Sequence, residues 1–298
     1  MITAHSHYQI GSSHKFCEDF ALHGFNEEGG YAIVCDGCSS SGFLNGIRQP
    51  INVDFGARIL SILVRQSISE MGLDFLCTEN ISPHPIRNKL FNVLFPKIKS
   101  IFSTMNIAYN VLDTTLLLGA MNHERGGVFC LGDGAVAIQR KDSKWEIYLI
   151  EYTENAPCYI SNYLLISNLD KYLESFKDQK IVIKYFETWD FISFENEKEM
   201  EYEKTHPIFI PVFDAKKIAL FSDGINTFGT EEQQKKGEKH NPIDIMAKLL
   251  DFPHIKGEFV SKRFNVINRW AQKNAVTHSD DLSVAVVGKT IEEAENGD

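Results

Sequence analysis

Carboxylates at the ends of apolar runs are the residues of this 298-residue chain that are best placed to do chemistry. Three such runs end in an aspartate–glycine pair and a fourth begins just after an aspartate: Asp36-Gly37, Asp133-Gly134, Asp223-Gly224 and Asp280. A single aspartate–glycine pair is more often a hairpin turn than a functional site. In an antiparallel sheet, however, the end of one strand lies beside the start of its neighbour. We therefore expect the four aspartates to converge.

Several ionised carboxylates in one site repel each other, so protons or cations must neutralise them. Carboxylate and carbonyl oxygens are the ligands that magnesium and manganese prefer. Two such ions about 3.5–4 Å apart can clamp a phosphate group and activate a water molecule. The chain contains no G-x-S-x-G elbow, no P-loop and no C-x5-R motif. The sequence therefore favours hydrolysis by a metal-activated water over attack by a side-chain nucleophile.

Together, the order and spacing of these motifs resemble the metal-dependent protein phosphatases of type 2C, from about residue 7 to residue 287. Each motif is short, and the resemblance depends on the whole set. The segments that carry it are Glu18-Asp19, Asp36-Gly37, Leu112-Asp113-Thr114-Thr115-Leu116, Gly132-Asp133-Gly134, Ser222-Asp223-Gly224 and Asp280-Asp281-Leu282-Ser283.

The resemblance implies an enzyme that hydrolyses phosphoserine and phosphothreonine in proteins. It implies two Mn²⁺ or Mg²⁺ ions per site, with a third, weaker ion near Asp133. The nucleophile would be a water that bridges the metals held by Asp36 and Asp223. The residues that the resemblance assigns to metal binding, directly or through ordered water, are Glu18, Asp19, Asp36, Gly37, Asp133, Asp223 and Asp280.

The sequence departs from the family pattern at several positions. His14 stands where the family commonly has an arginine that grips the substrate phosphate, and a histidine lacks the two-pronged guanidinium. His14 is either a phosphate contact or a polar loop residue. Cys17 replaces an asparagine, and Asp281 replaces the asparagine after the last ligand, where its charge either tightens metal binding or faces solvent. Asp113 replaces a small residue, and we favour a structural role for it.

Strand-like and helix-like runs indicate the elements that must position these residues. The predicted strands are 31–35, 116–121, 128–131, 135–138, 145–150, 180–186, 218–221 and 282–287. The predicted helices are 53–71, 86–105, 242–250 and 258–274. Because strands and helices do not alternate, mostly antiparallel sheets with helices outside are expected. The resemblance specifies an α+β fold, a four-layer α-β-β-α sandwich.

We expect one catalytic domain over residues 1–298. A substrate-contacting flap is placed at about 155–204, where Tyr159, Tyr163 and Trp189 are read as packing aromatics before partner contacts. The charged stretches 195–204 and 231–240 are expected to be solvated loops.

Composition excludes some classes of protein. The formal net charge of −10 argues against nucleic-acid binding. No secretory signal and no apolar stretch of about 20 residues is visible, so a cytoplasmic enzyme without a membrane segment is expected. The six cysteines are expected to be reduced thiols, with Cys35 and Cys38 packing around a turn. We expect a monomer that acts on phosphoproteins, with a partner serine/threonine kinase.

Two alternatives to an active protein phosphatase stay open. The missing arginine suits a catalytically weak, phosphatase-like module that binds a phosphoprotein or a kinase. It also suits a hydrolase of a small phosphorylated metabolite. Fold analogy does not separate these functions.

Overall fold

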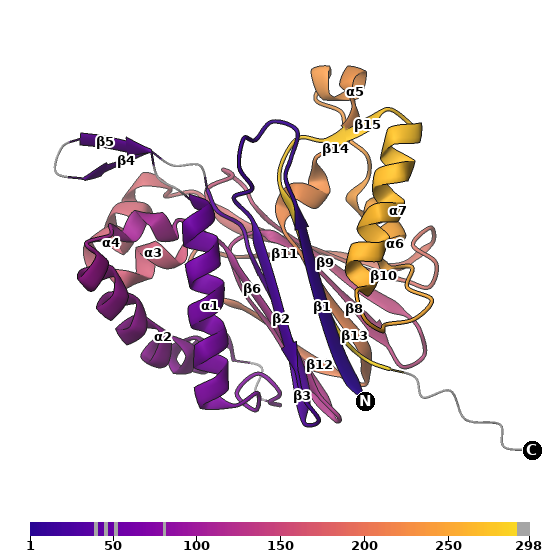
Figure 1. The fold of residues 1–298 in the computed structure, drawn as a ribbon, viewed down its shortest axis with the longest axis horizontal. Helices are drawn as coiled ribbons and strands as arrows, with labels where there is room; N and C mark the ends of the chain where they lie inside the picture. Colours follow the sequence, from indigo (N-terminus) through magenta and orange to yellow (C-terminus); the bar gives the residue numbers. More distant parts are fainter. Residues whose placement is uncertain (39–40, 45–46, 51–52, 80–81, 291–298) are drawn as a thin grey trace, which may run out of the picture.

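Two antiparallel sheets form the centre of the molecule (Figure 1). The computed structural model describes residues 1–38, 41–44, 47–50, 53–79 and 82–290. The larger sheet has seven strands in the order β1-β16-β13-β8-β9-β10-β11. Their bounds are β1 Ile2–Gln9, β8 Gly134–Arg140, β9 Trp145–Tyr152, β10 Lys180–Thr188, β11 Phe194–Glu203, β13 Ala215–Phe221 and β16 Leu282–Lys289.

The second sheet has five strands in the order β12-β7-β6-β3-β2. Their bounds are β2 Phe20–Phe25, β3 Gly29–Cys35, β6 Leu116–Asn122, β7 Arg125–Leu131 and β12 Ile208–Phe213. Two short pairs lie outside both sheets: β4 Ser41–Leu44 with β5 Ile47–Pro50, and β14 Phe228–Thr230 with β15 Val276–His278.

Helices cover the outer faces of the two sheets, which gives the predicted four-layer sandwich (Figure 1). Helices α1 and α2 pack against the five-stranded sheet, and α6 and α7 pack against the seven-stranded sheet. The helices are α1 Val53–Met71, α2 Pro83–Met105, α3 Ile160–Leu164, α4 Ile166–Ser175, α5 Glu231–Lys235, α6 Pro242–Leu250 and α7 Phe259–Lys273, with short 3-10 turns η1 Tyr109–Leu112 and η2 Asp223–Asn226.

Three apolar layers hold the sandwich together. Between the sheets, Leu117, Val136 and Leu220 are fully buried with other aliphatic side chains. The second layer joins α1 and α2 to the five-stranded sheet, and the third joins α6 and α7 to the seven-stranded sheet. Alternate residues of each strand therefore face different layers, as the period of a strand requires.

The structure confirms the predicted strands and the four predicted helices, with boundaries that agree within three residues. The sequence reading missed β1, β2 and β12. In β1, histidine and serine interrupt the apolar pattern (ITAHSHYQ), yet the strand pairs with β16 along its whole length. Helices α3 and α4 were likewise not predicted.

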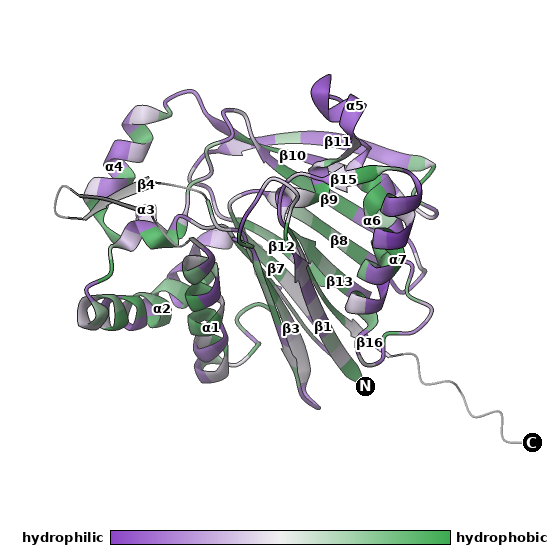
Figure 2. Ribbon diagram, turned by 45° about the horizontal axis from the view of Figure 1, so that its top comes forward, coloured by the Kyte–Doolittle hydropathy of each residue, from purple (hydrophilic) through white to green (hydrophobic). Residues whose placement is uncertain are grey.

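The prediction of a loop at 195–204 is wrong, because residues 194–203 form the edge strand β11. Its backbone pairs with β10, while its charged side chains are mostly exposed. Charge on an edge strand is typical, since it discourages pairing with other chains. Within 231–240, Glu231–Lys235 forms the exposed helix α5, which is hydrophilic in Figure 2.

All six cysteines are free thiols, as predicted. None of the helices among the described residues is long and apolar enough to span a lipid bilayer.

Candidate metal centre

A pocket of about 230 Å³ lies where β3, β13 and the β7–β8 connection end, next to the start of β16. All but one of the predicted site residues line it. Its lining consists of His14, Glu18, Asp36, Gly37, Cys38, Thr115, Asp133, Asn155, Pro157, Tyr159, Asp223 and Asp280. The remaining predicted residue, Asp19, is buried and hydrogen-bonded to Asp36. Residues far apart in the sequence therefore meet in one place, as expected.

Asp36 follows the last residue of β3 and is held by two threonines. Its backbone N–H donates to Oγ1 of Thr115 at 3.1 Å, and its carbonyl accepts from the Thr115 N–H at 2.8 Å. The same carbonyl accepts from the Thr114 hydroxyl at 2.7 Å, and Gly37 bridges to Thr114. The threonine pair before β6 thus fixes the position of the Asp36 backbone.

Asp19 lies under the pocket with only 1% of its surface exposed. Its Oδ2 accepts from the Ser283 hydroxyl at 2.8 Å, and its carboxyl also bonds with Ser222 and Asp36. Ser222 precedes Asp223 and Ser283 belongs to β16. Asp19 therefore ties the chain before β2 to both strand ends that carry the other aspartates.

Asp223 begins the turn η2 directly after β13, and its carboxyl bonds with that of Asp36. The next residue, Gly224, packs against the chain before β16, where an added Cβ would lie 1.7 Å from the Asp281 carbonyl oxygen. Only glycine permits so close a contact between the two backbones. This contact brings Asp223 and Asp280 to the same wall of the pocket.

Asp133 lies in the connection by which the chain leaves the five-stranded sheet at β7 and enters the seven-stranded sheet at β8. Gly132 and Gly134 on either side have φ values of +98° and +136°. Such values favour glycine. The Asp133-Gly134 pair is thus no hairpin within one sheet, and its aspartate faces the pocket.

Crowding and burial raise the pKa of the central carboxyls. Burial is the largest cause for Asp19, Asp36, Asp133 and Asp223, and the neighbouring carboxylates add to it. The pKa of Asp133 rises to about 8. Hydrogen bonds between carboxyls, such as that of Asp36 with Asp223, require a shared proton.

The donor set fits hard divalent cations, since it offers carboxylate oxygens and the backbone of Gly37 and no cluster of soft ligands. Among the described residues, no three His, Cys, Asp or Glu side chains are already arranged to hold a metal ion. The carboxyls bond with each other instead. A cation would replace the proton between them and turn their oxygens toward itself.

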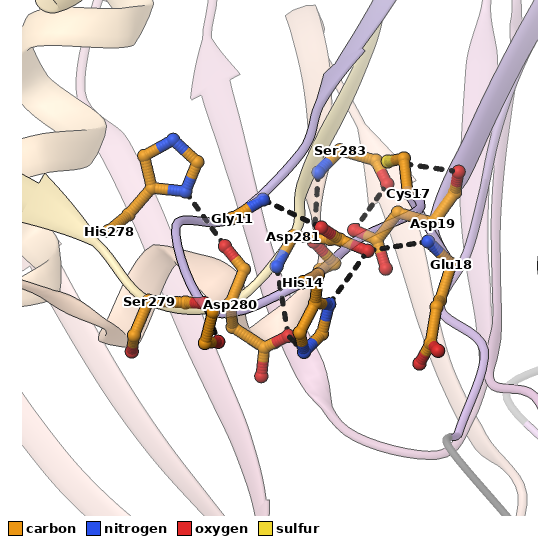
Figure 3. A network of polar contacts seen from close by, with 12 residues as sticks. Gly11, His14, Cys17, Glu18, Asp19, His278, Ser279, Asp280, Asp281 and Ser283 are labelled. Atoms are coloured by element: carbon orange, nitrogen blue, oxygen red, sulfur yellow. Dashed lines mark hydrogen bonds and ion pairs between the residues drawn. The ribbon is translucent and has the colours of Figure 1, made fainter.

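Asp281 was expected either to tighten metal binding or to face solvent, and it does neither. It is buried and does not line the pocket (Figure 3). It accepts hydrogen bonds from the backbone N–H groups of Gly11, at 2.7 Å, and Glu18. His14 lies beside it, with Nδ1 3.1 Å from Asp281 Oδ2 and Nε2 3.6 Å from Asp280 Oδ1. Asp281 thus fastens the loop between β1 and β2.

His14 lies on the pocket wall next to these acids. Burial alone lowers its pKa, but Asp281, Asp280 and Glu18 outweigh this effect and raise it. The imidazole therefore favours its cationic form more than a free histidine does. His14, for which a phosphate contact and a polar loop position were both considered, therefore lies at the edge of the pocket beside Asp280 and Asp281.

Several residues of the site were not predicted. Tyr159 and Cys38 line the pocket and bond to each other, and Asn155 and Pro157 complete the wall. Asn155, Pro157 and Tyr159 lie within the expected flap, whereas Cys38 was expected only to pack around a turn. Asp113 is structural, as favoured: its carboxylate accepts from the Ser161 hydroxyl at 2.5 Å.

A model of the family described as protein phosphatase 2C matches residues 5–252 of the chain. The chain belongs to this family. The match includes Asp36, Asp133 and Asp223 and ends before Asp280. No curated protein matches the chain.

Solved structures of protein phosphatase 2C relatives resemble the fold. The serine/threonine phosphatase Stp1 from Staphylococcus aureus is 13% identical, with a TM-score of 0.49, and the similarity covers 98% of this chain and 96% of Stp1. The Mycobacterium tuberculosis serine/threonine phosphatase PstP/Ppp is 12% identical, with a TM-score of 0.46 and coverage of 96% and 98%. RsbX in complex with magnesium is 11% identical, with a TM-score of 0.44 and coverage of 96% and 94%.

Proposed function

We propose that this chain hydrolyses phosphoserine and phosphothreonine in proteins, with two Mn²⁺ or Mg²⁺ ions held between its aspartates. One observation carries the proposal: Asp36, Asp223 and Asp280 come from distant parts of the chain and line one pocket. Burying so many carboxylates is costly unless cations neutralise them. Bound cations would thus account for the gathering of these aspartates in one pocket.

A protein substrate is supported by a larger hollow that adjoins the pocket. It has a volume of about 780 Å³ and shares Asp133, Asp223 and Asp280 with the pocket. It extends over β9 to β11 and along residues 239–243 before and into α6. This space has room for the chain on either side of a phosphorylated residue, and its volume also lies within the range of small-ligand sites.

The residues of the chain divide the work of binding and orientation. Asp36, Asp223, Asp280 and the Gly37 carbonyl would hold the cations, with Glu18 and Asp19 ordering their water shell and Asp133 holding a third ion. When bound, the cations would supply Lewis-acid activation of a water molecule and neutralise charge at the phosphate.

His14, in its cationic form, would contact a phosphate oxygen from the pocket wall. Thr114 and Thr115 fix the Asp36 backbone through the hydrogen bonds described above. A protein kinase that phosphorylates serine or threonine would supply the substrate.

The test compares Asp36→Asn and Asp223→Asn with the unchanged protein, using p-nitrophenyl phosphate and a phosphothreonine peptide with Mn²⁺. Each substitution removes a charge from the metal site, so kcat/KM should fall at least about 100-fold on both substrates. Asp214→Asn is the matched control, because Asp214 is exposed and pairs with Lys141 far from the pocket. Unchanged turnover in both site variants would contradict the proposal.

One observation favours the second candidate, a phosphatase-like module that binds without cleaving. His14 stands where the family commonly has an arginine that grips the substrate phosphate, and an imidazole cannot supply the same two-pronged contact. Titration calorimetry separates the two functions. If Mn²⁺ binds at or below millimolar concentration and Asp36→Asn abolishes this binding, the enzyme is supported. If no Mn²⁺ binds at millimolar concentration, the module is supported.

A further inference from the structure

A second pocket, of about 300 Å³, lies at the opposite end of the seven-stranded sheet from the carboxylates. It is enclosed by the starting end of β13, the finishing end of β16 and the segment between α6 and α7. Its lining consists of Gln139, Ser143, Lys216, Lys217, Phe252, Pro253, His254, Ile255, Lys256, Lys289 and Thr290. In Figure 2, β16 ends below α7 beside the first residues of the chain.

Four lysines and one histidine surround this pocket, although the protein has a net charge of −10. Within the described part of the chain, no carboxylate forms an ion pair with any of the four lysines. The nearby carboxylates are already engaged: Asp251 pairs with Arg263 at 3.2 Å, and Asp214 pairs with Lys141. The lysines therefore form a concentration of positive charge that Asp251 and Asp214 offset only in part.

Lys217 shows this most clearly. Its ammonium group lies 5.6 Å from the centre of the Phe252 ring and 6.0 Å from that of Trp145. Burial, and then the charge of Lys216, lower its pKa, although Asp251 acts in the opposite direction. Burial and Lys141 lower the pKa of Lys289 in the same way, against the effect of Asp214. Holding these cations close together costs free energy, which a bound anion would recover.

The partners that the other ammonium groups have are neutral, so these partners do not exclude an anion. Lys216 donates to the Ser143 hydroxyl at 3.0 Å, and Lys289 donates to the His123 carbonyl at 2.8 Å. Each ammonium retains further N–H donors. Phe252 and Ile255 form an apolar wall beside them.

We propose that this lysine pocket binds a small molecule carrying a phosphate or diphosphate group. Four cations match a ligand with several negative charges, and the volume is at the lower end of small-ligand pockets. The apolar wall would cover the uncharged part of the ligand. Lys217 lies near the start of β13 and Asp223 lies just beyond its end, six positions or about 20 Å further on, so the pocket is distinct from the carboxylate centre.

The test is a calorimetric titration of the full chain with pyrophosphate in EDTA and 0.15 M NaCl. Without metal, the carboxylate centre offers the probe no metal ion, so binding that the lysine substitutions weaken reports the lysine pocket. We expect saturable binding with a dissociation constant below about 1 mM. In Lys216→Ala/Lys256→Ala it should weaken at least about tenfold, since each charge-assisted hydrogen bond is worth about that factor.

Lys235→Ala/Lys236→Ala is the matched control, because it removes the same charge from the exposed helix α5. Its affinity should stay within about twofold of the unchanged protein, as long-range effects are screened at this salt concentration. Lys217→Met keeps the buried stem and provides a second test should the double variant misfold.

Three results would overturn the proposal. One is the absence of saturable binding up to 20 mM pyrophosphate, and the second is an equal loss of affinity in the α5 control. The third concerns the segment after Thr290, whose sequence IEEAENGD carries four side-chain carboxylates. If pyrophosphate binds only after Glu292, Glu293 and Glu295 are changed to glutamine, the pocket belongs to this segment and not to a phosphorylated ligand.

Discussion

The carboxyls of Asp19, Asp36, Asp133 and Asp223 show how one type of side chain behaves when it is crowded and buried. Alone in water, each would ionise near pH 4. In the pocket, burial and the neighbouring charges raise every one of these pKa values. The metal-free protein therefore holds protons at these carboxyls more tightly than a free aspartate does.

These raised pKa values predict an unusual pH dependence of stability for the metal-free protein. Between pH 8.8 and 7.2 the unfolded carboxyls stay ionised, whereas the folded ones take up protons, as Asp133 does with a pKa of about 8. The free energy of unfolding should thus increase as pH falls through this window. Thermal melting in EDTA measures it.

The same melting series in Asp133→Asn and in excess Mn²⁺ provides the control for this prediction. The pH dependence should shrink in the variant, and it should shrink further with Mn²⁺ because cations replace the protons. A melting temperature that rises from pH 7.2 to 8.8 without metal would contradict the raised pKa values.

At this scale the sequence predicted much of the site. The strand-end aspartates and the motif order placed Glu18, Asp36, Asp223 and Asp280 correctly around one pocket. It did not predict the roles of Asp281 or Tyr159, because these depend on contacts between segments that no local pattern encodes. Asp281, for example, bonds to backbone groups about 270 residues away in the sequence.

Among the elements, the loop between β1 and β2 depends on a single buried side chain. Asp281 accepts from the backbone N–H groups of Gly11 and Glu18 and lies beside His14. An asparagine there has one acceptor oxygen and an amino group that must face a donor. Asp281→Asn should therefore destabilise the protein by about 1–3 kcal/mol.

Chemical denaturation measures this loss, and hydrogen exchange locates it. The amides of Gly11 and Glu18 should lose protection more than those of β16 do. Asp214→Asn serves as the exposed comparison, and its stability should change by less than about 0.5 kcal/mol. Equal stability of the two variants would show that Asp281 does not fasten the loop.

Gly56 of helix α1 allows a close contact with the turn η1. At Gly56 an added Cβ would lie 1.7 Å from the carbonyl oxygen of Val111, in η1. Alanine favours a helix by about 1 kcal/mol over glycine. The clash should outweigh this gain, so Gly56→Ala should destabilise the protein by about 2 kcal/mol net. Ser69→Ala, on the exposed end of α1, should change the melting temperature little in the same scan.

Elements that bury an apolar face could be predicted from their periodicity, as α1 and α6 were. Those held mainly by backbone pairing could not, and β1 and β11 are the examples. In β11, alternating glutamates give no apolar signal, although its hydrogen bonds to β10 are continuous over most of its length. The local sequence of β11 does not indicate that β10 is its partner strand.

At the scale of the whole molecule, the stability of the sandwich depends on the apolar layer between the two sheets. Leu220 of β13 is fully buried there. Leu220→Ala should cost about 2–5 kcal/mol, since the rigid sheets cannot close the cavity. Urea denaturation measures the loss. Ile166→Ala, at a side chain 82% exposed, should stay within about 0.5 kcal/mol of the unchanged protein.

The arrangement of the two sheets followed from the family resemblance more than from residue patterns. Strand-like runs indicated antiparallel sheets with outer helices, but they did not specify which strands are neighbours. Long-range pairing such as that of β1 with β16 joins the two ends of the described chain. Only tertiary packing decides such an order.

The position of β16 has a consequence for synthesis of the protein. This last strand lies between β1 and β13, so β1 has no neighbour in its sheet before residues 282–289 leave the ribosome. Asp280 also emerges only at that stage. A nascent chain therefore gains its completed sheet and its full set of aspartates at nearly the same moment.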